Sequence, residues 1–450
     1  MLTPNSTIAT MSSWGKGPFG PLNPVHEHIM RNAEDIQPAA LVWWAVGTAP
    51  LVGQAWFILA PNTRPVRAAL AAAGVSLLTH AFMSYRFLDP HKNLMNNFFG
   101  FVWLYIIIKY VEWGMLEGPI VDPWMKKGRS RPMAAIDLLF NVRNVYLGSI
   151  GLDNGMGPPN ATVKDIVVAS HLPRPWRPLP RWLTILRHLY AFGWRILGAD
   201  VIYAMIERVG KDTICYPGGM PGGGAVDSFV THTAVTMFPG TQIQYELPSL
   251  LLTALVCLVV PAVIWLQLGW IYHLLAAVCV SSGLWEVSSW DVPIFDSPLR
   301  LDSIMAFWGR RWHGVVRHEF TILSVILERM LFIPAHSLLR VTLVYLISAA
   351  FHIVGQLSMD PVPDPTGIAM IFILSAVGCG LELSWKRVTG QRVEGFLGRL
   401  WVYPYMIWAV RAATDGWIDA GFLAGPPFGM GRVVNDWLTT WMYHDHARSI

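Results

Sequence analysis

The sequence is poor in charged residues and in cysteine. Charged residues make up 14% of its 450 residues and hydrophobic ones 53%, whereas an ordinary soluble domain is about a quarter charged. The four cysteines lie far apart and form no C-x-x-C pair, so neither a zinc site nor a disulfide framework is indicated. The net charge of +4 is too small for a nucleic-acid-binding surface. This composition is typical of a polytopic membrane protein.

The first 38 residues lack the pattern of a secretory signal peptide. They are polar and rich in Pro, Gly and Asn, and no basic segment is followed there by an apolar core. We expect membrane insertion to be signalled by the first spanning helix instead. Residues 1–38 are therefore predicted to form a polar N-terminal segment, and residues 39–450 a single membrane-embedded unit.

Eight stretches are apolar enough to cross a bilayer, which takes about 20 mostly apolar residues. They are Ala39–Leu59, Val66–Tyr85, Met95–Trp113, Ser249–Trp265, Trp270–Trp285, Leu338–Ile353, Ile368–Leu383 and Phe396–Val410. Ile185–Ile206 carries Arg187 and Asp200, so it either spans with its polar face inward or lies along the interface. Leu323–Ile333 is short and fits a re-entrant or interfacial helix. The predicted fold is an all-α polytopic membrane protein with about 8–9 transmembrane helices plus re-entrant or interfacial helices.

Basic residues concentrate in two polar regions of the chain. The first is Gly114–Arg181 and the second is Val287–Pro334. Cytosolic loops are enriched in Lys and Arg, so both regions are expected on the cytosolic side if Ile185–Ile206 does not cross. The 22 tryptophans and 13 tyrosines fit the aromatic belts of membrane–water interfaces.

His352 lies in an apolar stretch that is predicted to be helical. Ser348, His352 and Gln356 recur every four residues and so form one polar stripe. The stripe must face protein or a water-filled cavity, because lipid offers no hydrogen-bond partner. It is either a hydrogen-bonding contact between helices or a catalytic site in which neutral His352 acts as a general base.

A second polar patch lies at Phe307–His313 (FWGRRWH). If Phe307–Phe320 is helical, Arg310, His313 and Arg317 share one face. This basic face either binds anionic lipid head groups or pairs with the phosphates of a cofactor. The patch alone does not decide between the two.

Other polar residues in the apolar runs are expected to be structural. Glu382 and Lys386, at i and i+4 near the end of a predicted span, are expected to form an ion pair. His80 and His273 lie singly in apolar runs and are interpreted as interior histidines. His444-Asp445-His446 lies close to the C-terminus and is not interpreted as a metal site, so no metal is expected.

The two patches together resemble a known family. The segment Phe307–His313, preceded by Trp290–Arg300, is similar to the wax synthase domain of the membrane-bound O-acyltransferase superfamily. The apolar helix Leu346–Gln356, with Phe351-His352, resembles the helix that carries the superfamily's catalytic histidine. The likeness is strong over Trp285–Gln356 and looser upstream.

The resemblance implies transfer of an acyl group from acyl-CoA to the hydroxyl of a lipophilic acceptor. Acyl-CoA would be a co-substrate, and no permanently bound cofactor is expected. His352 would deprotonate the hydroxyl as it attacks the thioester carbonyl, without an acyl-enzyme. His313 stands where the wider superfamily usually has Asn and wax synthase-like members commonly have His. It would orient the thioester or donate a hydrogen bond to the developing oxyanion.

The resemblance also gives roles to the residues around the two histidines. Trp308 and Trp312 would form the walls of the acyl tunnel. Arg310, Arg311 and Arg317 would bind the phosphates of CoA. Ser348 and Gln356 would line the substrate pocket.

The acceptor is predicted to be a terpenoid-like alcohol that receives an acetyl group. The long regions Gly114–Arg181 and Glu207–Leu247, with the Pro/Gly-rich insert Pro217–Gly224, resemble fungal acetyltransferases of terpenoid and meroterpenoid pathways. The alternative within enzymes is a wax synthase that uses long-chain alcohols. The alternative from another class is a transporter, but the sequence lacks the paired half-repeats typical of transporters. The expected location is the endoplasmic reticulum membrane.

Overall fold

The computed structural model describes residues 22–116, 128–140, 179–210, 249–285, 287–290, 293–312, 314–332 and 338–425, with short pieces at 119–120, 125, 214, 235–236 and 244–245. The helices are α1 (Asn23–Asn32), α2 (Pro38–Phe57), α3 (Arg64–Ser84), α4 (Asn93–Met115), α5 (Arg131–Phe140), α7 (Arg181–Gly210), α9 (Ser249–Ser281), α10 (Ile304–Ala306), α11 (Arg317–Met330), α12 (Leu338–Val354), α13 (Pro365–Thr389) and α14 (Gly395–Asp419). Short turns of other helix types are η4 (Pro90–Lys92), η6 (Val287–Trp290) and η7 (Phe307–Arg311). Two small sheets pair β1 (Glu34–Asp35) with β2 (Tyr85–Arg86) in parallel, and β3 (Val235–Thr236) with β4 (Gln244–Tyr245) antiparallel.

The described part of the chain is mostly helical, as predicted. Five of its helices are long and apolar enough to cross a membrane, and α12 is a shorter apolar helix. The five are Arg64–Ser84, Pro90–Met115, Arg181–Glu207, Ser249–Ser281 and Pro365–Thr389. They include the ambiguous stretch Ile185–Ile206, which forms part of α7 and is long enough to span. The number of eight to nine spans stays a prediction.

The prediction of two spans at Ser249–Trp265 and Trp270–Trp285 is wrong, because α9 runs through both as one helix of 33 residues. At 1.5 Å per residue it is about 50 Å long, more than the roughly 30 Å of a bilayer core. The polar break around Gln267 is too short to turn the chain. A Cβ at Gly269 would lie 2.5 Å from the Arg195 side chain of α7. The glycine therefore allows α7 and α9 to pack closely at this point.

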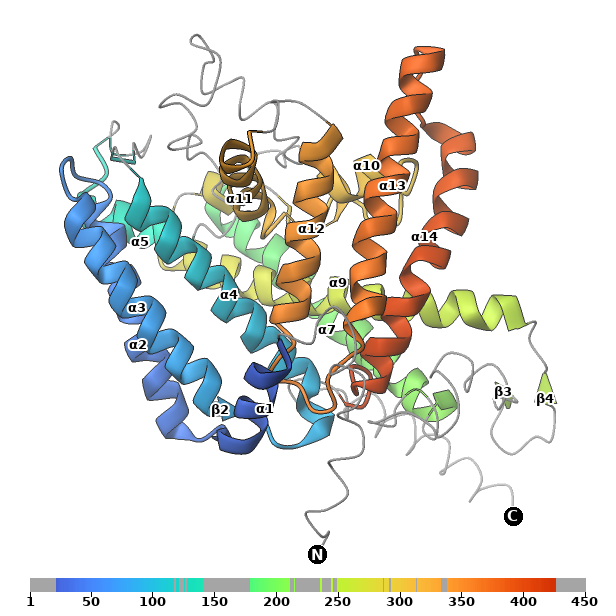
Figure 1. The fold of residues 1–450 in the computed structure, drawn as a ribbon, viewed down its shortest axis with the longest axis horizontal. Helices are drawn as coiled ribbons and strands as arrows, with labels where there is room; N and C mark the ends of the chain where they lie inside the picture. Colours follow the sequence, from blue (N-terminus) through green and yellow to red (C-terminus); the bar gives the residue numbers. More distant parts are fainter. Residues whose placement is uncertain are drawn as a thin grey trace, which may run out of the picture.

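The helices form three groups. Helices α2, α3 and α4 pack in sequence order, as do α12, α13 and α14, and α7 pairs with α9. Figure 1 shows the first group in blue and teal on one side and α13 with α14 in orange and red on the other. Helix α12 stands between these groups and contacts both α4 and α13. The residue proposed to be catalytic therefore lies on a central helix.

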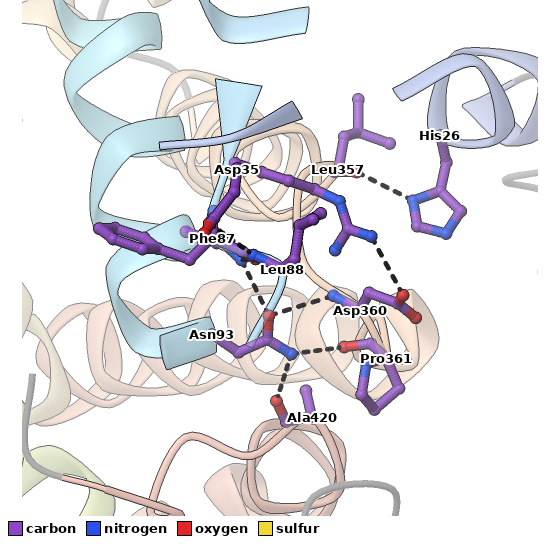
Figure 2. A network of polar contacts seen from close by, with 11 residues as sticks. His26, Asp35, Phe87, Leu88, Asn93, Leu357, Asp360, Pro361 and Ala420 are labelled. Atoms are coloured by element: carbon purple, nitrogen blue, oxygen red, sulfur yellow. Dashed lines mark hydrogen bonds and ion pairs between the residues drawn. The ribbon is translucent and has the colours of Figure 1, made fainter. Parts of the chain in front are cut away.

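The segment after α12 is held against the start of α4 and against α1. His26 of α1 donates from Nδ1 to the backbone carbonyl of Leu357 at 2.9 Å, and Arg86 of β2 pairs with Asp360 at 3.3 Å. Figure 2 shows this network, in which the amide of Asn93 contacts three backbone groups. Helix α1 belongs to the predicted polar N-terminal segment, yet it packs on α3 as part of the helical body.

Candidate active site

His352 presents a basic nitrogen within a cage of aromatic rings. It is half-buried on α12, and its Nδ1 lies 2.7 Å from the backbone carbonyl oxygen of Ser348. A carbonyl only accepts hydrogen bonds, so Nδ1 carries the proton and Nε2 keeps the lone pair. Ring centroids of Phe101, Phe351 and Phe372 lie 5.0, 5.8 and 4.6 Å from the imidazole. This tautomer, in apolar surroundings, is suited to accept a proton from a lipophilic hydroxyl.

Trp308 is linked to His352 through the ring of Phe372. It is part of η7, a π-helical turn, a rare geometry that is frequent at functional sites. Its indole N–H donates to the Ser375 hydroxyl of α13 at 3.0 Å, and its ring is 5.8 Å from Phe372. Phe372 in turn contacts His352. The structure therefore brings the Phe307–Trp312 segment and the histidine of α12 into one aromatic cluster.

Trp312 directly follows the same turn. Its ring is 5.2 Å from Phe307 and 5.3 Å from Phe295. Its backbone N–H donates to the Phe307 carbonyl at 2.8 Å, which closes the π-helical turn. The two tryptophan rings thus belong to one aromatic cluster, with centroids 6.4 Å apart, and their role as walls of an acyl tunnel stays a prediction.

The three arginines of the predicted phosphate site differ in their surroundings. Arg310 is about half exposed and pairs with Asp296 at 3.3 Å. Arg311 is buried, and its Nη2 donates to both carboxylate oxygens of Asp302 at 3.1 and 3.2 Å. Arg317 begins α11, and burial lowers its pKa to about 10, so it stays charged at neutral pH. Arg310 and Arg317 remain candidates for phosphate binding, whereas Arg311 is committed to an internal ion pair.

His313 lies outside the described residues. The backbone on either side of it is fixed to neighbouring segments. The Asp296 N–H donates to the Arg311 carbonyl at 3.1 Å, and the Gly314 N–H donates to the Ile294 carbonyl at 3.2 Å. These two hydrogen bonds therefore fix Arg311 and Gly314 against residues 294–296.

Comparison with known proteins covers this same region. Residues 290–374 match the model of the Membrane bound O-acyl transferase family. The matched range contains Trp308, all of α12 and Phe372. The predicted resemblance to membrane-bound O-acyltransferases is confirmed.

Three curated relatives bear on the kind of acyltransferase. The chain is 28% identical over 169 residues to acetyltransferase fsoF of Humicola fuscoatra, covering 33% of this chain and 39% of the relative. It is 26% identical over 148 residues to acetyltransferase ataH of Aspergillus terreus (30% and 48%). It is 32% identical over 134 residues to acetyltransferase atnC of Arthrinium sp. (29% of each). The chain spans less than half the length of each of these relatives.

The two polar neighbours of His352 in the sequence, Ser348 and Gln356, differ in position: Ser348 lies within α12 and Gln356 lies after its end. Ser348 is 7% exposed, and its carbonyl, one turn before His352, orients the imidazole. The prediction of a regular helix through Gln356 is wrong, because α12 ends at Val354. The N–H of Gln356 donates to the Ile353 carbonyl at 3.2 Å, an i to i+3 bond that tightens the last turn. Gln356 is nevertheless buried, with 1% exposed.

Glu382 positions the tryptophan segment, which the sequence did not indicate. Its carboxylate accepts hydrogen bonds from Ser303 Oγ (2.6 Å) and from the backbone N–H groups of Ile304 (2.6 Å) and Met305 (3.1 Å). It also accepts one from Trp401 Nε1 at 3.2 Å. Glu382 thus caps α10, which leads directly into η7. The ion pair expected with Lys386 is replaced by this cap, and the only available signal was a carboxylate within an apolar helix.

A buried charge cluster joins α4 to α11. Lys109 Nζ lies 3.0 Å from Glu319 and 3.8 Å from Glu112, and His318 Nε2 lies 2.7 Å from Glu112. Glu319 has no exposed surface. The next residue, Phe320, packs its ring 5.2 Å from Phe351 beside His352. The cluster was also missed, although Lys109 and Glu112 within an apolar run gave a usable signal.

Proposed function

We propose that this chain is a membrane-bound O-acyltransferase that moves an acetyl group from acetyl-CoA to a hydroxyl of a lipophilic, terpenoid-like alcohol. The observation that carries the proposal is the tautomer of His352, whose Nδ1 is bound to the Ser348 carbonyl while Nε2 remains basic. It lies within the residues that match the acyltransferase family. The names of the three relatives support acetyl as the group transferred.

The proposed reaction needs one general base and no acyl-enzyme. Nε2 of His352 takes the proton of the acceptor hydroxyl as its oxygen attacks the thioester carbonyl. The tetrahedral oxyanion then collapses, the carbon–sulfur bond breaks, and the CoA thiolate leaves and recovers the proton from His352. We assign stabilisation of the oxyanion to His313 and binding of CoA phosphates to Arg310 and Arg317.

The aromatic surroundings suit an acceptor that arrives from the bilayer. Phe101, Phe351 and Phe372 offer ring faces and edges to an apolar skeleton next to the base, and apolar contact favours such a partner by burial of its surface. Trp308 and Trp312 continue this aromatic surface into the segment that also carries Arg310. We therefore place the acyl chain and thioester between the tryptophans and His352. We also propose that the protein resides in the endoplasmic reticulum membrane.

The test is acyl transfer by microsomes that contain the full chain. They are supplied with labelled acetyl-CoA and a sterol-like alcohol, and product formation is compared for wild type and His352→Ala. We expect the variant to lose activity by at least a hundredfold, the lower end for loss of a general base. His80→Ala is the matched control, because His80 is an exposed histidine of the apolar helix α3; the interpretation of His80 as an interior histidine is wrong. Normal turnover by His352→Ala would overturn the proposal.

Two further comparisons address the finer assignments. His313→Ala should be strongly impaired, while His313→Asn should retain part of the activity, since an amide also donates a hydrogen bond to an oxyanion. A clear preference for palmitoyl-CoA with hexadecanol would replace the terpenoid acceptor with a long-chain alcohol. Full activity of His313→Ala would remove His313 from the mechanism.

A further inference from the structure

Two side-chain amides near His352 are buried with an unpaired polar atom. Gln356, just after α12, is 1% exposed, and Asn97 of α4 is 4% exposed. Among the residues that the structure describes, Gln356 Nε2 and Asn97 Oδ1 have no hydrogen-bond partner. A buried donor or acceptor left unpaired costs about 1–3 kcal/mol. These two are among several such atoms in the described residues, and their place beside His352 distinguishes them.

The two amides belong to one contact between α4 and the segment after α12. A Cβ added to Gly100 would collide with the carbonyl oxygen of Gly355, so the two backbones touch there. Further along, with the two chains running in opposite directions, Ser358 Oγ donates to the Asn96 carbonyl at 3.3 Å. Both unpaired amides stand in sequence between these two contacts. They therefore lie in the same short stretch where the two segments face each other.

The neighbouring amides of α4 are fully used by the fold, in contrast to Asn97. Asn93 Oδ1 accepts from the Asp360 N–H at 3.1 Å, and its Nδ2 donates to the Ala420 carbonyl at 2.8 Å (Figure 2). Asn96 Oδ1 accepts from the Phe87 N–H at 2.8 Å, and its Nδ2 donates to the Phe87 carbonyl at 2.9 Å. The fold thus saturates two of three closely spaced asparagines and leaves the third with an open position.

The open positions lie next to the proposed base. Phe101 follows Asn97 by one turn on α4, and its ring is 5.0 Å from His352. A Cβ added to Gly355, the residue before Gln356, would lie 2.5 Å from the Phe101 ring. Gln356 follows His352 by four residues, in the tight turn that its N–H closes on the Ile353 carbonyl just after α12. A molecule held by His352 is therefore within reach of the amides.

We propose that Gln356 and Asn97 bind a second hydroxyl of the acceptor, close to the hydroxyl that His352 deprotonates. This inference rests on the proposed function. A hydroxyl both accepts and donates, so it can take the hydrogen bond from Gln356 Nε2 and give one to Asn97 Oδ1. It satisfies both amides even if their oxygen and nitrogen positions are exchanged. The acceptor class is thus a diol on an apolar skeleton, in preference to a simple alkanol.

The size of the expected preference follows from the unpaired groups. A site built to hydrogen-bond a substrate hydroxyl rejects the analogue that lacks it strongly, because the buried polar groups of the site then stay unpaired. We expect a preference of at least tenfold in kcat/KM for a diol over the matched mono-ol. The preference should reside mainly in KM, since the second hydroxyl takes no part in bond breaking.

The experiment compares two acceptors in microsomes that contain the full chain. The probes are decalin diols with hydroxyls on different rings and the corresponding decalin mono-ols, each with labelled acetyl-CoA. In Gln356→Met and Asn97→Leu the diol to mono-ol ratio of kcat/KM should fall at least tenfold. Their melting temperature in detergent micelles should not fall, because replacing an unpaired buried amide by an apolar group of similar size removes a cost. Asn93→Leu is the matched control and should melt at a lower temperature.

Three results would overturn the inference. The first is an unchanged ratio in both variants. The second is a loss of melting temperature equal to that of Asn93→Leu, which would make the amides part of the fold. The third is transfer by wild type to both acceptors without a diol preference, which would defeat this inference alone. Absence of transfer from wild type to any alcohol would instead defeat the proposed function.

Discussion

Glu382 offers a sharp test of how the site is held together. Its buried carboxylate receives four hydrogen bonds, of which the shortest come from the Ser303 hydroxyl and the Ile304 N–H, both at 2.6 Å. Ile304 is fully buried, so water cannot replace the lost acceptor there. Because α10 leads into η7, the carboxylate fixes the starting point of the segment that carries Trp308.

The expected effect can be worked out from these bonds. A hydrogen bond to a charged group contributes about 1.5–3 kcal/mol, so loss of the two shortest bonds in Glu382→Ala should lower the free energy of unfolding by about 3–6 kcal/mol. Glu382→Gln keeps one acceptor oxygen and should lose about half as much. The glutamine variant should still fold, yet its acyl transfer should fall by about tenfold or more, because small displacements at a site are costly to catalysis.

The measurement combines thermal unfolding in detergent micelles with the microsomal transfer assay. Glu394→Gln is the control, since Glu394 is an exposed glutamate at the start of α14. The order of stability should be wild type and Glu394→Gln together, then Glu382→Gln, then Glu382→Ala. If Glu382→Ala unfolds at the temperature of the control, the carboxylate does not hold α10 and the reasoning is refuted.

Three other predictions concern the packing and charge around α12. Gly100→Ala should sharply reduce both melting temperature and transfer, because its Cβ would collide with the Gly355 carbonyl. An unaffected variant would show that α4 does not touch the segment after α12 there. Lys109→Met should destabilise by about 3–5 kcal/mol by leaving the buried Glu319 carboxylate without its cation, and Lys109→Met with Glu319→Gln should recover much of this in a double-mutant cycle. Burial lowers the pKa of His26 below 6.5, so the unfolded chain binds more protons and stability should fall as pH drops below about 6.5; an equally steep fall in His26→Phe would contradict this.

Helical spacing predicted the local structure around His352 as long as the helix continued. The four-residue interval between Ser348 and His352 correctly placed one turn of helix between them, and the hydrogen bond from the imidazole runs along that turn. The same interval failed at Gln356, because the chain leaves the α-helix after Val354. Hydropathy failed for a related reason in α9, where two apolar runs separated by Gln267 proved to be one helix. Periodicity indicates which type of secondary structure a segment forms, whereas the position of its ends depends on the segments packed around it.

The contacts that assemble the site were beyond sequence reasoning. Glu382 is 79 residues from its partner Ser303, and Lys109 is far in sequence from Glu319. A lone charge in an apolar run shows that a partner is required, but many residues could supply one. The nearest opposite charge in sequence, Lys386, was the natural expectation for Glu382 and was wrong. Long-range pairing is settled by how helices pack, which the spacing within one helix does not determine.

Two pairs of buried polar residues near α12 differ in how the fold pairs them. Glu382 and Asn93 have their hydrogen bonds completed by the fold. Gln356 and Asn97, beside the proposed base, each keep a bonding position that the described chain does not fill. Completing a bond stabilises the folded state, whereas an open position costs stability and is recovered only when a ligand binds. Variants of Glu382 and Asn93 should therefore lose stability and transfer together, while variants of Gln356 and Asn97 should lose selectivity alone.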